Sequence, residues 1–153
     1  MTTIGVISDT HGLLRLEARA ALHGSDYIIH AGDIGAPAIL DRLGEIASVT
    51  AVRGNVDYGT WAEKLPLTNV LEIRGVSIYV LHILDRLNLD PAAAGFAAVV
   101  YGHSHEPKQE IKNGVLYFNP GSAGPRRFSL PISVGRLTAC DGRIKGEVLK
   151  LNV

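Results

Sequence analysis

The sequence predicts an α/β protein in which sheets and helices form a layered sandwich. Over the first part of the chain, short runs rich in β-branched residues alternate with stretches that repeat Leu, Ile and Ala at helical spacing. After about residue 68, short apolar runs come in pairs separated by turn-forming dipeptides. Parallel β-α-β units followed by antiparallel hairpins are therefore expected.

The first part contains five predicted elements. Residues 3–8, 26–32 and 48–54 are expected to be strands, because they are short and β-branched. Residues 13–24 and 37–47 are expected to be helices, because their apolar residues recur every three or four positions. This order predicts β-α-β-α-β with parallel pairing.

The second part is expected to contain hairpins at residues 69–82, 109–122 and 132–153, turning about 74–75, 113–114 and 141–142. Asn113-Gly114 is well suited to a type I′ turn. A further apolar run, "AAVVYGHSH", ends in two histidines. Residues 85–96 predict a helix or an irregular turn, since Pro91 and Gly95 interrupt them. The two parts are expected to form two packed sheets in one domain spanning residues 1–153.

Composition fits one globular domain and gives no sign of a nucleic-acid or membrane protein. The chain has 153 residues, 46% hydrophobic, and a formal net charge of zero, so no overall field attracts nucleic acid or anionic lipid. No apolar stretch approaches the roughly 20 residues that span a bilayer, and residues 1–12 do not resemble a secretory signal. Cys140 is the lone cysteine, which excludes an intramolecular disulfide. We expect a cytoplasmic protein.

Potential metal ligands stand where the predicted strands end. The carboxyl ends of strands in α/β sheets gather at one edge, so these side chains are expected to converge. Imidazole, carboxylate and carboxamide donors suit Mn, Fe, Ni, Co or Zn, and there are more of them than one ion needs. Two metals about 3.5–4 Å apart are a known solution for attack at phosphorus. The candidates are Asp9 and His11 in "SDTHG", Asp33 in "AGD", Asn55 and Asp57 in "RGNVD", His82, and His103 and His105 in "GHSH".

This ordered set, followed by "NPGS", closely resembles the calcineurin-like metallophosphoesterase family, and within it the small single-domain phosphodiesterases of bacteria and archaea. The resemblance implies a four-layer αββα sandwich. It also implies a phosphodiesterase in which a hydroxide bridging two divalent metals attacks phosphorus.

The resemblance further implies a division of the ligands. Asp9, His11 and His105 would hold the first ion, Asn55, His82 and His103 the second, and Asp33 would bridge them. Asp33, Asn55 and His103 would be the catalytic residues among these. Manganese is the expected metal, with Fe, Ni, Co and Zn as alternatives.

Two positions depart from the family pattern. Ile83 follows His82 where the family often has Gly, which makes His82 the least secure ligand. Val56 follows Asn55 where many phosphatases of the wider family have a histidine that protonates the leaving group. A general acid is typically worth about 10²–10⁴ in rate, so its absence favours substrates with good leaving groups.

Several roles stay open at this level. A phosphomonoesterase and a non-catalytic interaction scaffold of the same fold are the alternatives to a phosphodiesterase. The expected substrate is a small phosphodiester, with nucleotides among the candidates. Asp57 would either orient a ligand histidine or cap a loop, and "NPGS" would either cradle an anion or form a tight turn.

The remaining basic residues receive weaker assignments. Arg53, Arg126 and Arg127 would either contact phosphate or face solvent. His30 lies in an apolar run and is expected to be a core histidine, and His23 is expected to end a helix. Neither is expected in the metal site.

Overall fold

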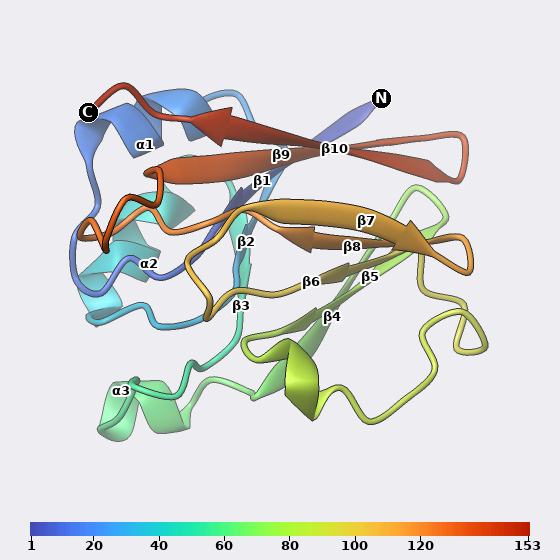
Figure 1. Ribbon diagram of the computed structural model, residues 1–153, viewed down its shortest axis with the longest axis horizontal. Coiled ribbons are helices and arrows are strands. Elements are labelled where there is room, and N and C mark those ends of the chain that lie inside the picture. The colour runs from blue at the N-terminus through green and yellow to red at the C-terminus, as the bar shows by residue number, and fades with distance from the viewer.

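Two five-stranded mixed sheets pack face to face in the computed structural model, which describes residues 1–153 (Figure 1). In spatial order, the first sheet contains β10 (Arg143–Lys150), β9 (Ser133–Cys140), β1 (Thr2–Ile7), β2 (Tyr27–His30) and β3 (Ser48–Ala51). The second contains β4 (Thr68–Ile73), β5 (Val76–Leu81), β6 (Ala98–Val100), β8 (Val115–Asn119) and β7 (Lys108–Lys112).

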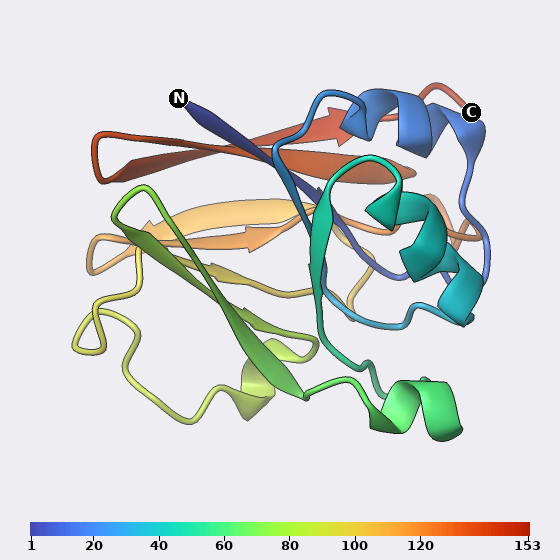
Figure 2. The ribbon, with the colours of Figure 1, turned by 180° about the vertical axis from the view of Figure 1, so that it is seen from behind.

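The predicted β-α-β-α-β order is confirmed. Strand β1 pairs parallel with β2, and β2 pairs parallel with β3. The crossovers contain α1 (Leu16–Leu22) and α2 (Pro37–Gly44), which cover the outer face of the first sheet (Figure 2). A four-residue helix that the sequence pattern did not indicate, α3 (Thr60–Glu63), precedes β4. No helix is long and apolar enough to cross a membrane.

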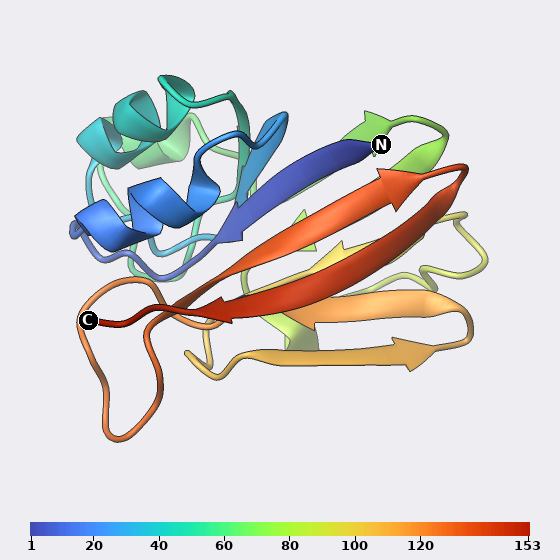
Figure 3. The same ribbon diagram turned by 90° about the horizontal axis from the view of Figure 1, so that it is seen from above.

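The three predicted hairpins are present, but the last one joins the first sheet. Their turns place Arg74, Asn113 and Asp141 at positive φ, each followed by a glycine at positive φ. Strand β9 pairs antiparallel with β1, so the C-terminal hairpin extends the N-terminal sheet (Figure 3). The expectation that the two parts of the chain each form their own sheet is wrong, because the free edge of β1 takes β9 as its partner.

The layered α/β sandwich is confirmed, with a reduced outer layer over the second sheet. That face is covered by a 3₁₀ turn, η1 (Leu84–Arg86), and by the loop that leads to β6. Leu84, Leu87 and Phe96 pack there against strand residues such as Tyr79 and Val99. A turn stands where the four-layer pattern has a helix because Pro91 and Gly95 interrupt the segment.

The main core lies between the two sheets. Ile4 and Val6 point into it from β1, whereas Ile7 packs on the opposite face with helix residues such as Leu22, as the two-residue period of a strand requires. Phe118 is fully buried and fits against Gly135 and Gly146 of the facing sheet. A Cβ atom on Gly135 would lie 2.4 Å from the Phe118 ring, so the close sheet contact requires glycine there.

Replacing Phe118 should show that this contact stabilises the sandwich. Phe118→Ala is expected to lower the free energy of unfolding by about 3–5 kcal/mol, because it removes buried area and leaves a cavity. Phe128→Ala is the matched control, since Phe128 is 88% exposed, and it should change stability by less than about 0.5 kcal/mol. Denaturant unfolding measures both, and equal effects of the two substitutions would contradict the assignment.

Candidate metal centre

The strand ends of both sheets bring the predicted ligands together. Asp9 and His11 follow β1, Asp33 follows β2 and Asn55 follows β3, while His82 follows β5 and His103 and His105 follow β6. Nitrogen and oxygen atoms of Asp9, His11 and His105 lie within 4.8 Å of one another, and so do those of Asp33, His82 and His103. Asn55 joins the second group, with its Oδ1 3.1 Å from His103 Nδ1.

The two groups meet through their carboxylates. In the first group, Asp9 Oδ1 lies 3.8 Å from His11 Nε2 and 3.4 Å from His105 Nε2. Asp33 Oδ2 lies 3.8 Å from His11 Nε2 and 3.1 Å from His82 Nε2, so it faces one imidazole of each group. This position between the groups is the one a bridging ligand needs.

The remaining oxygen of each carboxylate is held by hydrogen bonds. Asp9 Oδ2 accepts bonds from the Ser8 hydroxyl at 2.6 Å and the His103 backbone N–H at 3.1 Å. Asp33 Oδ1 accepts the Val56 N–H at 3.0 Å. Each carboxylate therefore points one fixed oxygen into the cluster.

His82 lies in the cluster despite the residue that follows it. Its side chain is nearly fully buried, and Nδ1 donates to the Ala31 carbonyl at 2.7 Å, which directs Nε2 toward Asp33. Ile83 has φ −111° and ψ 113°, an extended conformation that any side chain can adopt. The turn after His82 thus needs no glycine.

The backbone at this site is strained. Positive φ angles are uncommon outside glycine, yet Asp9, His11, Asp33, His103 and His105 have φ between 47° and 74°. Such residues cost about 1–3 kcal/mol each and persist where the surrounding structure holds them, often at functional sites. Hairpin turns elsewhere in the chain place Arg74, Asn113 and Asp141 at similar angles, so what distinguishes this site is that five such residues are candidate ligands at one edge of the sandwich.

Close contact between the loops holds the cluster together. A Cβ atom on Gly54 would lie 2.1 Å from the backbone nitrogen and Oδ1 of Asp33, so no larger residue fits there. Asp57 accepts the backbone N–H groups of Ile34, Gly35 and Gly54 at 2.9–3.1 Å. Of its two open roles, Asp57 therefore organises loops and does not orient a histidine.

The "NPGS" segment supports the histidine loop. Asn119 Nδ2 donates to the Gly102 carbonyl at 3.2 Å and to Ser104 Oγ at 3.1 Å, while its Oδ1 accepts the Gly121 N–H at 2.9 Å. The Ser122 hydroxyl donates to the Asp9 carbonyl at 3.1 Å. The segment thus connects the loops that carry Asp9 and the two histidines, a role that sequence reasoning missed although the motif marked the place.

His30 is a buried structural histidine, as expected. Its Nδ1 accepts the Gly32 N–H at 3.1 Å, so Nε2 carries the proton and donates to the Thr10 hydroxyl at 3.0 Å. That hydroxyl in turn donates to the Ile34 carbonyl at 2.8 Å. Burial lowers the pKa of His30 to about 4, which keeps the ring neutral.

Contacts within the cluster favour the ionised form of its carboxyl groups and the protonated form of its imidazoles. Burial would raise the pKa of Asp9, but the neighbouring His105 and His11 rings hold that pKa well below its ordinary value. The pKa of His11 is raised, chiefly by contact with Asp9. Burial lowers the pKa of His82, but contact with Asp33 outweighs it and the net pKa is raised. Cations are therefore stabilised at the centre of the cluster.

The donor set fits divalent metals. Asp9 Oδ1 and His82 Nε2 are buried and face other candidate ligands: Asp9 Oδ1 lies 3.4 Å from His105 Nε2, and His82 Nε2 lies 3.1 Å from Asp33 Oδ2. Bound cations would satisfy buried donor atoms that face one another in this way. Donors about 2.1 Å from one ion lie about 3.0–3.4 Å apart at octahedral or tetrahedral angles. The separations within each group, 3.1 to 3.8 Å, are close to those values.

The arginines that were candidate phosphate contacts differ in position. Arg53 lines a pocket beside Asn55 and His82. Arg127 is exposed, and its charge acts against the raised pKa of His11. Arg126 donates to the carbonyl groups of Leu130 and Val153, which makes it a structural residue of its loop.

The chain matches the model of the calcineurin-like phosphoesterase superfamily domain over residues 2–142. It is 39% identical over 132 residues to the probable metallophosphoesterase MJ0623 of Methanocaldococcus jannaschii, covering 78% of this chain and 67% of that protein. Phosphodiesterase YfcE of Escherichia coli K12 is 32% identical over 155 residues, covering 85% of this chain and 84% of that protein. The chain belongs to the calcineurin-like phosphoesterase superfamily, as its motifs indicate.

The same fold is also present in a solved structure with low sequence identity. Vps29 of Chaetomium thermophilum superposes with a TM-score of 0.79 at 18% identity, covering 98% of this chain and 97% of that chain. At this identity the likeness concerns the fold alone.

The support from Asn119 can be tested by metal titration. Asn119→Ala is expected to weaken Mn²⁺ affinity by about 10–100-fold, because the loop of His103 and His105 loses its clamp. Asn88→Ala, in an exposed loop, should leave the affinity unchanged. Calorimetric titration of both metal-stripped variants measures the effect. Wild-type affinity in an Asn119→Ala protein that melts cooperatively would contradict the role.

Proposed function

We propose that the protein is a metal-dependent phosphodiesterase that uses two divalent ions to hydrolyse a small phosphate diester. The observation that carries the proposal is the convergence of the strand-end donors, in which the buried atoms Asp9 Oδ1 and His82 Nε2 face other candidate ligands. The family membership supports the same class of reaction.

The proposed division of ligands follows the two groups. Asp9, His11 and His105 would hold one ion and Asn55, His82 and His103 the other, with Asp33 between them. Bound ions would neutralise phosphate charge and lower the pKa of a coordinated water, and manganese is the ion we propose.

The chain itself positions these groups before substrate arrives. Val56 N–H fixes Asp33, and the Ala31 carbonyl fixes the His82 ring, so neither must reorganise during the reaction. Asn55 and His103 are exposed, whereas Asp9, Asp33, His82 and His105 are buried. Substrate would therefore approach from the side of Asn55 and His103, and we propose these two and Asp33 as catalytic residues.

The Val56 side chain, which lies beside the site, favours a diester with a good leaving group. Val56 is 45% exposed and borders the space next to His11 and Tyr58, where a histidine could have supplied a proton. An aliphatic side chain cannot protonate a leaving alkoxide. Diesters of acidic alcohols or phenols are the proposed substrates, and phosphomonoesters are the weaker alternative.

A non-catalytic scaffold is the second candidate, because the fold also matches Vps29. The enzyme is favoured because the chain keeps every donor of the motif, and these donors converge at one edge of the sandwich.

Removing the bridging carboxylate tests the proposal. Asp33→Asn is expected to lower kcat for bis(4-nitrophenyl) phosphate by at least about a hundredfold, because an amide cannot provide the same charge between two ions. Asp41→Asn, on the exposed face of α2, should retain wild-type turnover. Release of 4-nitrophenolate with saturating Mn²⁺ measures both.

The same assay on 4-nitrophenyl phosphate compares diester with monoester. The proposal requires a higher kcat/KM for the diester. Undiminished metal-dependent hydrolysis by Asp33→Asn, or wild-type protein that prefers the monoester, would contradict it.

A further inference from the structure

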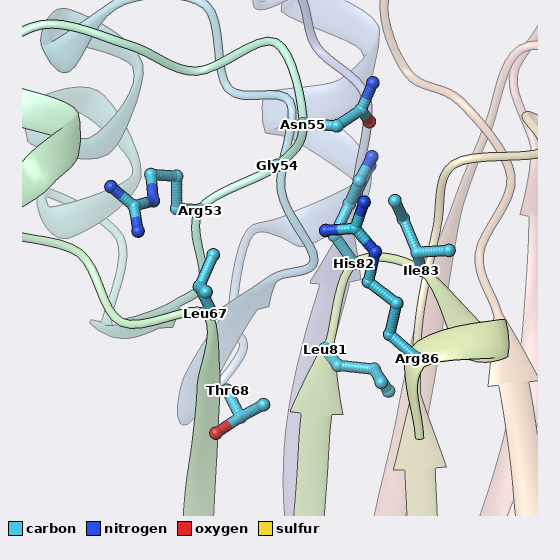
Figure 4. A pocket seen from close by; sticks show the side chains of 9 residues that line it. All are labelled: Arg53, Gly54, Asn55, Leu67, Thr68, Leu81, His82, Ile83 and Arg86. Carbon is cyan, nitrogen blue, oxygen red and sulfur yellow. The ribbon is translucent and has the colours of Figure 1, made fainter. Parts of the chain in front are cut away.

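A pocket of about 170 Å³ opens beside the candidate metal centre, and two proposed ligands form part of its wall (Figure 4). Asn55 and His82 line it directly. Sites that hold a whole drug-sized ligand are typically about 300–1,000 Å³. This pocket is therefore suited to one substituent of a molecule whose reacting group lies at the metal centre.

The charged residues of this pocket are arginines without partners. Arg53 and Arg86 line it, and no Asp or Glu does. Figure 4 shows the Arg86 side chain extending from η1 toward the part of the pocket that His82 and Asn55 line, with Arg53 and Leu67 on the other side in this view. The guanidinium groups that do make ion pairs or side-chain hydrogen bonds belong to Arg15, Arg19, Arg74, Arg126 and Arg136, so Arg53 and Arg86 share their lack of a partner with Arg42, Arg127 and Arg143.

The remaining lining of this pocket includes apolar side chains, those of Leu67, Leu81 and Ile83. Attraction between opposite charges increases as the surrounding dielectric falls, and guanidinium groups bind phosphate or carboxylate through paired hydrogen bonds.

The opposite side of the metal centre has a different character. The space next to His11 is bordered by Val56, Tyr58 and Trp61, with no Lys or Arg. A phosphate diester carries two organic groups. The pocket lined by Arg53 and Arg86 and the space next to His11 are suited to different organic groups. The uncharged aromatic group fits beside Tyr58 and Trp61, and an anionic group fits beside Arg86.

We propose that the pocket lined by Arg53 and Arg86 is a specificity subsite for a second anionic group, a phosphate or carboxylate, carried by the diester substrate. The inference rests on the proposed phosphodiesterase function and narrows its substrate class to diesters with an additional negative charge. Arg86 is the main specificity-determining residue, because its side chain extends from η1 into the pocket that the proposed ligand His82 also lines.

Matched substrates test this subsite. Thymidine 5′-(4-nitrophenyl phosphate) and the same diester bearing a 3′-phosphate share the reacting group and the leaving group. Wild-type protein is expected to prefer the 3′-phosphate by about tenfold or more in kcat/KM. A 3′-O-carboxymethyl analogue shows whether a carboxylate is accepted as well. Arg86→Gln should bring these ratios close to one, whereas Arg143→Gln, on exposed β10, should keep them.

Binding provides a readout that does not require turnover. Calorimetry on Mn²⁺-loaded protein should show tighter binding of thymidine 3′,5′-bisphosphate than of thymidine 5′-phosphate, and Arg86→Gln should remove the difference. If diesters are hydrolysed but neither anionic analogue is preferred, the subsite is wrong and the function stands. If the binding preference holds without turnover, the subsite stands and the phosphodiesterase assignment is wrong.

Discussion

The close approach of two buried carboxylates, Asp9 and Asp33, is the constraint on which the site depends. Burial and the charge of Asp9 oppose ionisation of Asp33, yet the His82 ring and the Val56 N–H keep the pKa of Asp33 below its ordinary value. Positive charge must therefore lie between the loops. The positive φ angles of Asp9 and Asp33 and the absence of a side chain at Gly54 bring the oxygens close enough to share it.

The fold supplies the rigidity that this arrangement requires. Strand ends from both sheets contribute donors, so the packing between sheets sets the distance between the two groups. The C-terminal hairpin stabilises both features. It packs Gly135 and Gly146 against Phe118, and its first residue, Ser133, donates through Oγ to the Pro120 carbonyl at 2.7 Å. Core and candidate site thus share one set of contacts.

Sequence reasoning reached the elements and the donors because their signals are local. The turns at Asn113 and Asp141 and the donors at strand ends can be read from neighbouring residues. The partner of β9 could not, because the edge of β1 and the ring of Phe118 lie far away in the chain. The hydrogen bonds of Asn119 were missed for the same reason, since they join loops from different strands, and the loop role of Asp57 stayed one of two alternatives until the fold placed its partners. The sequence did not single out Arg86, because Arg86 and His82 line the same pocket only in the folded chain.

The number of metal ions per chain tests the central claim most directly. Wild-type protein stripped with a chelator and titrated with Mn²⁺ should bind two ions per chain, with anomalous scattering placing them on either side of Asp33. Its melting temperature should rise as the ions bind, because binding to the native state stabilises it. Saturation at fewer than two ions, or a melting temperature unchanged by metal, would contradict this account.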